Sequence, residues 1–293
     1  MTQIRPLDAA LEGLRIIRHK PGLVLAWTGF YLLSALGLIG VLLVGLGPKV
    51  MTLAPVAQGG ERDLDQLFAR FGLSAVVAFL AAIILTTMLA GAVYRSILRP
   101  EEKQHSYLQI GGDELRLLIL SLVVVFAVAA ISAVYGGVVF GLANRLSGFA
   151  YGLVTFLASV GGVVLTLWLA VRLSLSAAMT FSQRKVRLWQ AWKLTRGHAP
   201  RLLAMWGLTV VFVFVVTIVA ATLSWVVAGV LGFFTTLAQI DPGNLSHLSP
   251  GVALAVLGQL LIQLAIQVLV LVLLLVVAYA PPARAYLQLK DQA

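Results

Sequence analysis

Six apolar stretches dominate this 293-residue sequence, and each is long enough to cross a lipid bilayer. They cover roughly residues 22–46, 72–98, 115–142, 150–180, 202–235 and 252–280. A helix crosses the hydrocarbon core with about 20 apolar residues. Charged residues make up only 11% of the chain, against about 25% in soluble domains. We therefore predict an all-α integral membrane protein, with a six-helix membrane domain over residues 22–282.

The distribution of charge predicts the orientation of these helices. The side of the membrane that holds the two termini and the connections after the second and fourth stretches carries 17 of the 21 Lys and Arg residues, those at the adjoining helix ends included, and 7 of the 11 acids. The remaining connections carry four of each, so the whole net charge of +10 lies on one side. By the positive-inside rule that side is cytoplasmic. We expect three helix hairpins, with both termini in the cytoplasm.

The two ends of the chain are predicted to lie outside the membrane domain. Residues 1–21 contain an amphipathic segment with apolar residues on one helical stripe: Leu7, Ala10, Leu11, Leu14 and Ile17. We expect this segment to form an interfacial helix on the cytoplasmic leaflet, with a polar cap on the first membrane helix as the alternative. Pro281 and Pro282 are expected to end the last helix, leaving residues 283–293 as a cytoplasmic tail.

The connection 181–201 combines cationic and tryptophan side chains. Its candidate binding residues are Arg184, Lys185, Arg187, Trp189, Trp192, Lys193, Arg196 and Arg201. Cationic side chains resist translocation and indole rings favour the headgroup layer. Each Lys or Arg near an anionic membrane surface contributes about 1 kcal/mol of attraction. We therefore expect a non-enzymatic protein that binds a partner protein or anionic phospholipid here, assisted by residues 4–20 and 99–116; topology alone is the alternative explanation.

Residues that could carry out chemistry are few. No Asp or Glu falls within the six stretches, and Arg95 and Arg172 near their ends are expected to snorkel to water. The Glu101–Glu102 and Asp113–Glu114 pairs are expected to balance Arg99, Lys103 and Arg116. The four histidines lack metal-ligand spacing, and cysteine is absent. We predict no catalytic residues, no metal and no cofactor, and we attribute the basic surplus to topology rather than to nucleic acid.

A row of glutamines runs along the last stretch. Gln259, Gln263 and Gln267 are spaced four residues apart and share one helical face. An amide in hydrocarbon needs a partner, so the row is expected to form helix–helix hydrogen bonds. The alternative is a polar path through a transporter or lipid-handling protein. In the fourth stretch, Gly161–Gly162 is expected to mark either a kink or a close helix contact.

One motif resembles a known group of proteins. Residues 191–198 read Ala-Trp-Lys-Leu-Thr-Arg-Gly-His, and Leu202–Leu203 follow. This segment resembles bacterial multi-helix membrane proteins that are similar to the membrane domain fused to some glycerophosphodiester phosphodiesterases. The resemblance implies an all-helical protein of the bacterial inner membrane. It supplies no activity, because none of the catalytic carboxylates of those enzymes can be carried over to this sequence.

Overall fold

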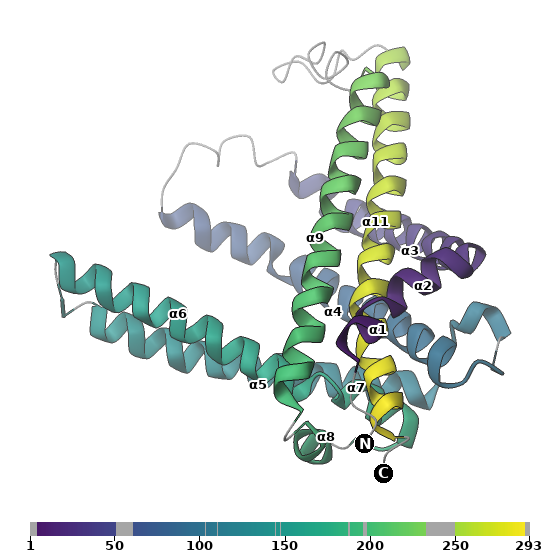
Figure 1. Ribbon diagram of the computed structural model, residues 1–293. Helices are drawn as coiled ribbons and strands as arrows, with labels where there is room; N and C mark the ends of the chain where they lie inside the picture. Colours follow the sequence, from purple (N-terminus) through teal and green to yellow (C-terminus); the bar gives the residue numbers. More distant parts are fainter. Residues whose placement is uncertain are drawn as a thin grey trace. The chain divides into compact units, whose positions relative to one another are not determined.

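The computed structural model describes residues 5–50, 61–102, 104–109, 111–143, 145–146, 148–186, 188–195, 198–232 and 250–290. All regular structure in these ranges is helical. The helices are α1 (Pro6–Ala10), α2 (Glu12–His19), α3 (Pro21–Val50), α4 (Glu61–Leu98), a 3-10 helix (Gln104–Tyr107), α5 (Gly112–Ala143), α6 (Gly148–Leu173), α7 (Ser176–Gln183), α8 (Leu188–Leu194), α9 (Ala199–Val230) and α11 (Pro250–Lys290) (Figure 1).

Six helical segments in the described chain are long and apolar enough to cross a membrane. They are Pro21–Leu42, Ser74–Leu98, Gly112–Leu142, Gly148–Gln183, Ala199–Val230 and Pro250–Lys290. Each corresponds to one of the six apolar stretches, so the helical class and the number of apolar helices predicted from the sequence are confirmed. The pairing into three hairpins and the cytoplasmic position of both termini stay predictions.

Several helices extend beyond the apolar stretches from which they were predicted. α4 begins at Glu61 and not near residue 72, and α5 begins at Gly112, which places Asp113 and Glu114 in its first turn. The apolar stretches themselves contain no carboxylates, but the longer helices that include them do. Apolarity follows the thickness of the bilayer, whereas helical hydrogen bonding continues into polar sequence. Acidic side chains in a first turn also interact favourably with the helix dipole.

The fourth apolar stretch is divided. α6 ends at Leu173, residues 174–175 form a turn, and α7 begins at Ser176. Ser174 Oγ donates to the carbonyl of Val171 at 2.8 Å, and Ser176 Oγ donates to the carbonyl of Leu173 at 2.6 Å. Serine hydroxyls that bond backbone carbonyls compete with regular helix. The predicted continuous helix over 150–180 is therefore wrong at this turn.

The last helix continues through both of its prolines. α11 runs to Lys290 with Pro281 and Pro282 inside it, so the predicted helix end near residue 280 is wrong. A proline in a helix interior costs about 3 kcal/mol relative to alanine. Burial after the prolines offsets this cost, because Ala283, Tyr286 and Leu289 belong to a hydrophobic core. The predicted tail is thus helical over 283–290.

The chain forms two compact units. The first comprises residues 1–13, 87–209 and 279–293, and the second comprises 14–86 and 210–278. In the second unit, Tyr31 Oη of α3 donates to the carbonyl of Leu85 in α4. In the first unit, α5 packs against α6 (Figure 1), and Tyr135 of α5 donates to the carbonyl of Ala158. Cβ atoms at Gly161 and Gly162 would lie 3.3 and 3.1 Å from Tyr135, which confirms the close-contact interpretation.

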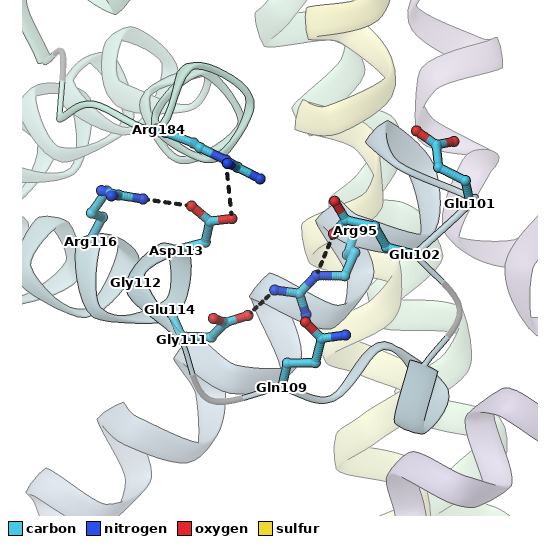
Figure 2. Close-up of a pocket in the computed structure, with 10 residues that line it drawn as sticks. All are labelled: Arg95, Glu101, Glu102, Gln109, Gly111, Gly112, Asp113, Glu114, Arg116 and Arg184. Atoms are coloured by element: carbon cyan, nitrogen blue, oxygen red, sulfur yellow. Dashed lines mark hydrogen bonds and ion pairs between the residues drawn. The ribbon is translucent and has the colours of Figure 1, made fainter.

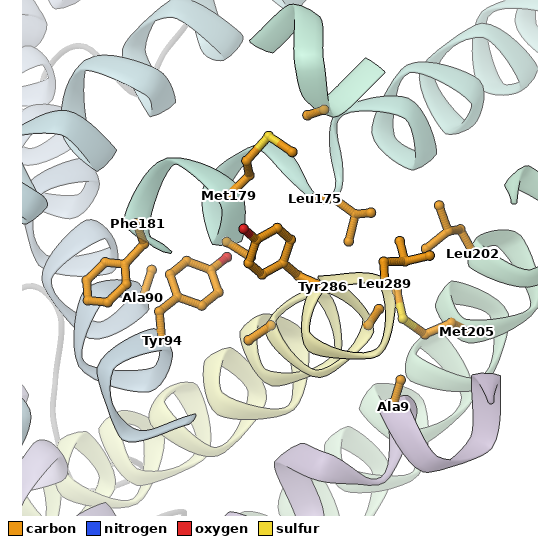
Figure 3. Close-up of a cluster of buried hydrophobic side chains, with 14 of the residues drawn as sticks. Ala9, Ala90, Tyr94, Leu175, Met179, Phe181, Leu202, Met205, Tyr286 and Leu289 are labelled. Atoms are coloured by element: carbon orange, nitrogen blue, oxygen red, sulfur yellow. The ribbon is translucent and has the colours of Figure 1, made fainter. Parts of the chain in front are cut away.

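The hydrophobic core of the first unit gathers around α7 (Figure 3). Phe181 and Met179 of α7 pack with Tyr94 of α4 and Tyr286 of α11. The ring centroids of Phe181 and Tyr94 are 6.0 Å apart, within the range of favourable aromatic pairs. Phe181 is 1% exposed. This core fixes the ends of α4 and α7, which carry the charged side chains described below.

The N-terminal segment forms two short helices joined at Leu11, and not one. Ala9 lies in the core of the first unit, whereas Leu7 is 55% exposed. Asp8 accepts hydrogen bonds from Arg284 Nε at 3.2 Å and Gln288 Nε2 at 3.0 Å of α11. These bonds orient α1 so that Ala9 faces the protein, while Leu7 of the predicted stripe is exposed. The position of this segment on the leaflet stays a prediction.

Candidate functional site

Arg95, near the end of α4, lies at the centre of a buried charge cluster. Its Nη2 donates to Glu114 Oε1, its Nη1 donates to the carbonyl of Tyr107 at 2.6 Å, and its Nε lies 3.4 Å from Glu102 Oε2. Arg95 is 2% exposed and Glu114 is 6% exposed. The expectation that Arg95 snorkels to water is wrong, because its guanidinium is paired with carboxylates inside the protein.

Asp113 joins further arginines to the same cluster. It accepts a hydrogen bond from Arg99 Nη1 at 2.9 Å and one from Arg116 Nη1 at 2.7 Å, and Arg184 Nε lies 3.9 Å away. Arg99 Nη2 also donates to the carbonyl of Phe181 at 3.0 Å. The expected pairing of Arg99 and Arg116 with the acids is therefore confirmed, while Lys103 lies outside the described residues.

These side chains line a pocket of about 600 Å³ (Figure 2). The charged residues at this charge pocket are Arg95, Arg116, Arg184, Glu101, Glu102, Asp113 and Glu114. Glu114 Oε2 is buried without a hydrogen-bond partner among the described residues. Glycines give its carboxylate room, since a Cβ at Gly91 would lie 3.1 Å from Oε1 and a Cβ at Gly111 would lie 3.3 Å from Oε2. The charges of the pocket are largely satisfied by one another.

The approach of Glu114 to Gly91 predicts an unusual response to alanine. Gly91→Ala is expected to destabilise the protein by about 1–3 kcal/mol, because the added methyl group forces the paired carboxylate away from Arg95. Gly207→Ala is the matched control: it also lies within a helix of the first unit, but its Cβ would meet nothing within 4 Å. The control is expected to raise stability by up to about 1 kcal/mol. Thermal unfolding in detergent micelles measures both, and equal effects would contradict the packing at Gly91.

Tyr107 holds the connection that carries Glu101 and Glu102. Ser106 and Tyr107 have φ angles of 55° and 65°, in the left-handed region, which non-glycine residues rarely adopt. The Tyr107 hydroxyl donates to the carbonyl of Pro100 at 3.1 Å, and the Tyr107 carbonyl accepts from Arg95. Burial, with a smaller contribution from Glu101, raises the pKa of Tyr107 above its ordinary value. The phenol therefore stays protonated near neutral pH and keeps this hydrogen bond.

The predicted binding residues of 181–201 divide into an exposed set and a packed set. Arg184 ends α7 in a left-handed conformation, with φ 55°, and reaches toward Asp113. Lys185 and Lys193 are exposed, and Trp189 is 70% exposed. Arg201 is half-buried in the first turn of α9. Arg187 and Arg196 lie outside the described residues.

Trp192 packs against two residues of α6. Its ring lies edge-on to Trp168, with centroids 5.0 Å apart. The guanidinium carbon of Arg172 lies 5.3 Å from the Trp192 centroid and 5.8 Å from the Trp168 centroid, within the range of cation–π attraction. Arg172 Nε and Nη1 are buried without a hydrogen-bond partner in the described chain. Arg172 is partly exposed and its guanidinium lies against two indole rings, while its expected snorkelling to water stays a prediction.

The glutamine row has a structural role at its first member. Gln259 Nε2 donates to the carbonyl of Leu231, just beyond the end of α9, at 2.6 Å. This bond joins α11 to the residue that follows α9, while helix–helix hydrogen bonding by the row stays a prediction. Gln263 is half-buried and Gln267 is exposed on the following turns of α11. All three glutamines belong to the second unit, whereas the basic connection 181–201 belongs to the first.

No protein-family model, curated protein or solved structure matches this chain. The resemblance of residues 191–198 to the membrane domain of certain phosphodiesterases therefore stays a hypothesis. Among the residues that the structure describes, no three His, Asp or Glu side chains lie close enough together to hold a metal ion. Function is therefore inferred below from the arrangement of cations, indole rings and apolar surface.

Proposed function

We propose that this protein is a multi-pass protein of the bacterial inner membrane that binds anionic lipid headgroups through a basic face. The basic face comprises the side chains of Arg184, Lys185, Trp189, Lys193 and Arg201. The observation that carries the proposal is Trp189, 70% exposed on α8 with exposed Lys185 and Lys193 nearby in the chain. An exposed indole beside ammonium groups suits the headgroup layer of a membrane.

The absence of acids in this region supports attraction to an anionic surface. Between residues 115 and 240 the sequence contains no Asp or Glu, while it contains nine Lys and Arg residues. Neutralisation of the basic face therefore depends on acids elsewhere, and Asp113 already pairs with Arg99 and Arg116. The predicted cytoplasmic orientation of this face would set it against a leaflet whose anionic lipids attract Lys and Arg.

The alternative of a polar transport path has less support. Gln259 uses its amide to join α11 to the end of α9, which is a packing role. The charge pocket of the first unit holds carboxylates and guanidiniums that pair with each other. We therefore propose lipid binding, without enzymatic activity, as the function that the residues support best.

Neutralising two exposed cations tests this function. The variant Lys185→Gln with Lys193→Gln is expected to weaken preference for anionic lipid about thirtyfold, because each cation contributes about 1 kcal/mol near an anionic surface. The full chain is reconstituted in bilayers of equal phosphatidylglycerol and phosphatidylcholine and then extracted in mild detergent. The ratio of the two retained lipids is the measurement.

Arg145→Gln provides the matched control. Arg145 is an exposed cation in the turn between α5 and α6, on the side of the membrane that is predicted to be neutral. This variant is expected to retain the wild-type lipid ratio. A loss of preference equal to that of the double variant would show that total charge, and not the basic face, governs binding.

A further inference from the structure

Arg172 carries a positive charge for which the described part of the chain offers no carboxylate. Two of its nitrogens, Nε and Nη1, are buried without a hydrogen-bond partner there. Its guanidinium contacts only the faces of Trp168 and Trp192 in the interactions described above. Leaving Nε and Nη1 of this partly exposed guanidinium buried without hydrogen bonds is unfavourable, so this geometry indicates an anion that completes the site.

An apolar groove begins beside this arginine. It has a volume of about 320 Å³ and is lined by Val164, Trp168 and Val171 of α6 and by Ala199, Pro200 and Leu203 of α9. Trp168 belongs to both features, since one ring contacts Arg172 and lines the groove. A volume near 300 Å³ lies at the lower end of ligand sites. The groove therefore suits part of an alkyl chain rather than a whole lipid.

Two more polar atoms near the start of α9 lack partners. His198 Nδ1 and Trp206 Nε1 are buried without hydrogen bonds in the described chain. His198 directly precedes Ala199, and Trp206 lies three residues after Leu203, on the same side of α9. An indole N–H is a donor only. These two atoms are unsatisfied polar groups near the groove in sequence, although neither residue belongs to its lining.

We propose that this site binds one phospholipid molecule, with its phosphate on Arg172 and one acyl chain in the α6–α9 groove. The proposal rests on the proposed function and assigns it a second, specific site. A guanidinium bonds two phosphate oxygens in a fork geometry, and the indole rings hold the guanidinium in place. Free inorganic phosphate would satisfy Arg172 but leave the apolar groove without an occupant, so the groove favours a lipid.

Native mass spectrometry of the full chain in mild detergent tests the proposal. Wild-type protein is delipidated and then mixed with either phosphatidylglycerol or dioleoylglycerol, which has the acyl chains without the phosphate. It is expected to retain one phosphatidylglycerol per chain and no dioleoylglycerol. Arg172→Gln is expected to weaken phosphatidylglycerol retention about tenfold to a hundredfold, since hydrogen bonds to charged groups contribute that much. Arg145→Gln, which removes the same charge elsewhere, is expected to retain the lipid as wild type does.

Leu203→Trp fills the groove without altering Arg172, and it keeps the proposal testable if Arg172→Gln fails to fold. It is expected to weaken retention at least tenfold. Retention unchanged in Leu203→Trp, or displacement of the lipid by millimolar inorganic phosphate, would show a simple anion site and overturn the proposal. Wild-type protein that retains no lipid in one-to-one ratio also overturns it; phosphatidylglycerol preference that still depends on Lys185 and Lys193 would then leave the proposed function standing.

Discussion

Arg95→Met is expected to lower the free energy of unfolding by about 3–5 kcal/mol, because it leaves the buried Glu114 carboxylate without its partner. The guanidinium also bonds the Tyr107 carbonyl at 2.6 Å, so the connection before α5 loses a second restraint. Denaturant unfolding in detergent micelles measures the change. Arg116→Met is the control: Arg116 pairs with Asp113 but is partly exposed, and an exposed pair contributes about 1 kcal/mol or less.

The double variant Arg95→Met with Glu114→Leu separates pairing from packing. Replacing both partners of a buried ion pair by apolar residues is often neutral or stabilising. We therefore expect the double variant to recover most of the stability that Arg95→Met loses. Additive losses in the double-mutant cycle would contradict a direct Arg95–Glu114 interaction.

Phe181→Ala is expected to cost about 3–5 kcal/mol, since Phe181 is 1% exposed in the core of the first unit. The ring also lies beneath two guanidiniums, with Arg99 at 4.9 Å and Arg95 at 5.5 Å from its centroid. The substitution therefore removes apolar packing and cation–π contacts together. Denaturant unfolding in the same micelles gives the change in stability.

Two companion variants show which part of the Phe181 side chain matters. Phe181→Leu keeps much of the side-chain volume but loses the ring face. It is expected to lower the free energy of unfolding, but by less than Phe181→Ala does. Phe149→Ala is the control, since Phe149 is 86% exposed and surface substitutions usually stay within about 0.5 kcal/mol. An equal loss of stability in Phe149→Ala would contradict the conclusion that burial of Phe181 in the core stabilises the protein.

The number and type of the long helices could be predicted from sequence because apolar length is a direct requirement of the bilayer. Helix ends could not, because they depend on packing. Pro281 and Pro282 predicted an end of α11 by local rules, but burial of Tyr286 and Leu289 outweighs the proline cost. Just after α6, the hydroxyls of Ser174 and Ser176 donate to carbonyls of its last turn, a local signal within the long apolar run.

The charge pocket could be predicted only in part. Opposite charges on either side of the short connection 99–111 were visible, and pairing of Arg99 and Arg116 with acids followed from them. The pairing of Arg95 with Glu114 could not be predicted, because an arginine near the end of a membrane helix is ordinarily expected to snorkel to water. Gly91 was the available signal: it lies four residues before Arg95, on the same helical face, and makes room for Glu114.

The Arg172 site shows a similar limit. Trp168 and Arg172 are four residues apart on α6, so their contact could be anticipated from helix geometry. The contribution of Trp192 could not, because it depends on the way α8 packs against α6. Trp192 belongs to the predicted basic segment, but its contact is with Arg172, which lies outside that segment.

The most direct test of anionic lipid binding uses the wild-type protein in the membrane in which it is made. Lipids that remain bound after extraction in mild detergent are compared with the bulk lipids of the same membrane by mass spectrometry. Binding through Lys185, Lys193 and the Trp189 surface predicts that anionic lipids are enriched severalfold over the bulk. Bound lipids with the same composition as the bulk membrane would contradict it.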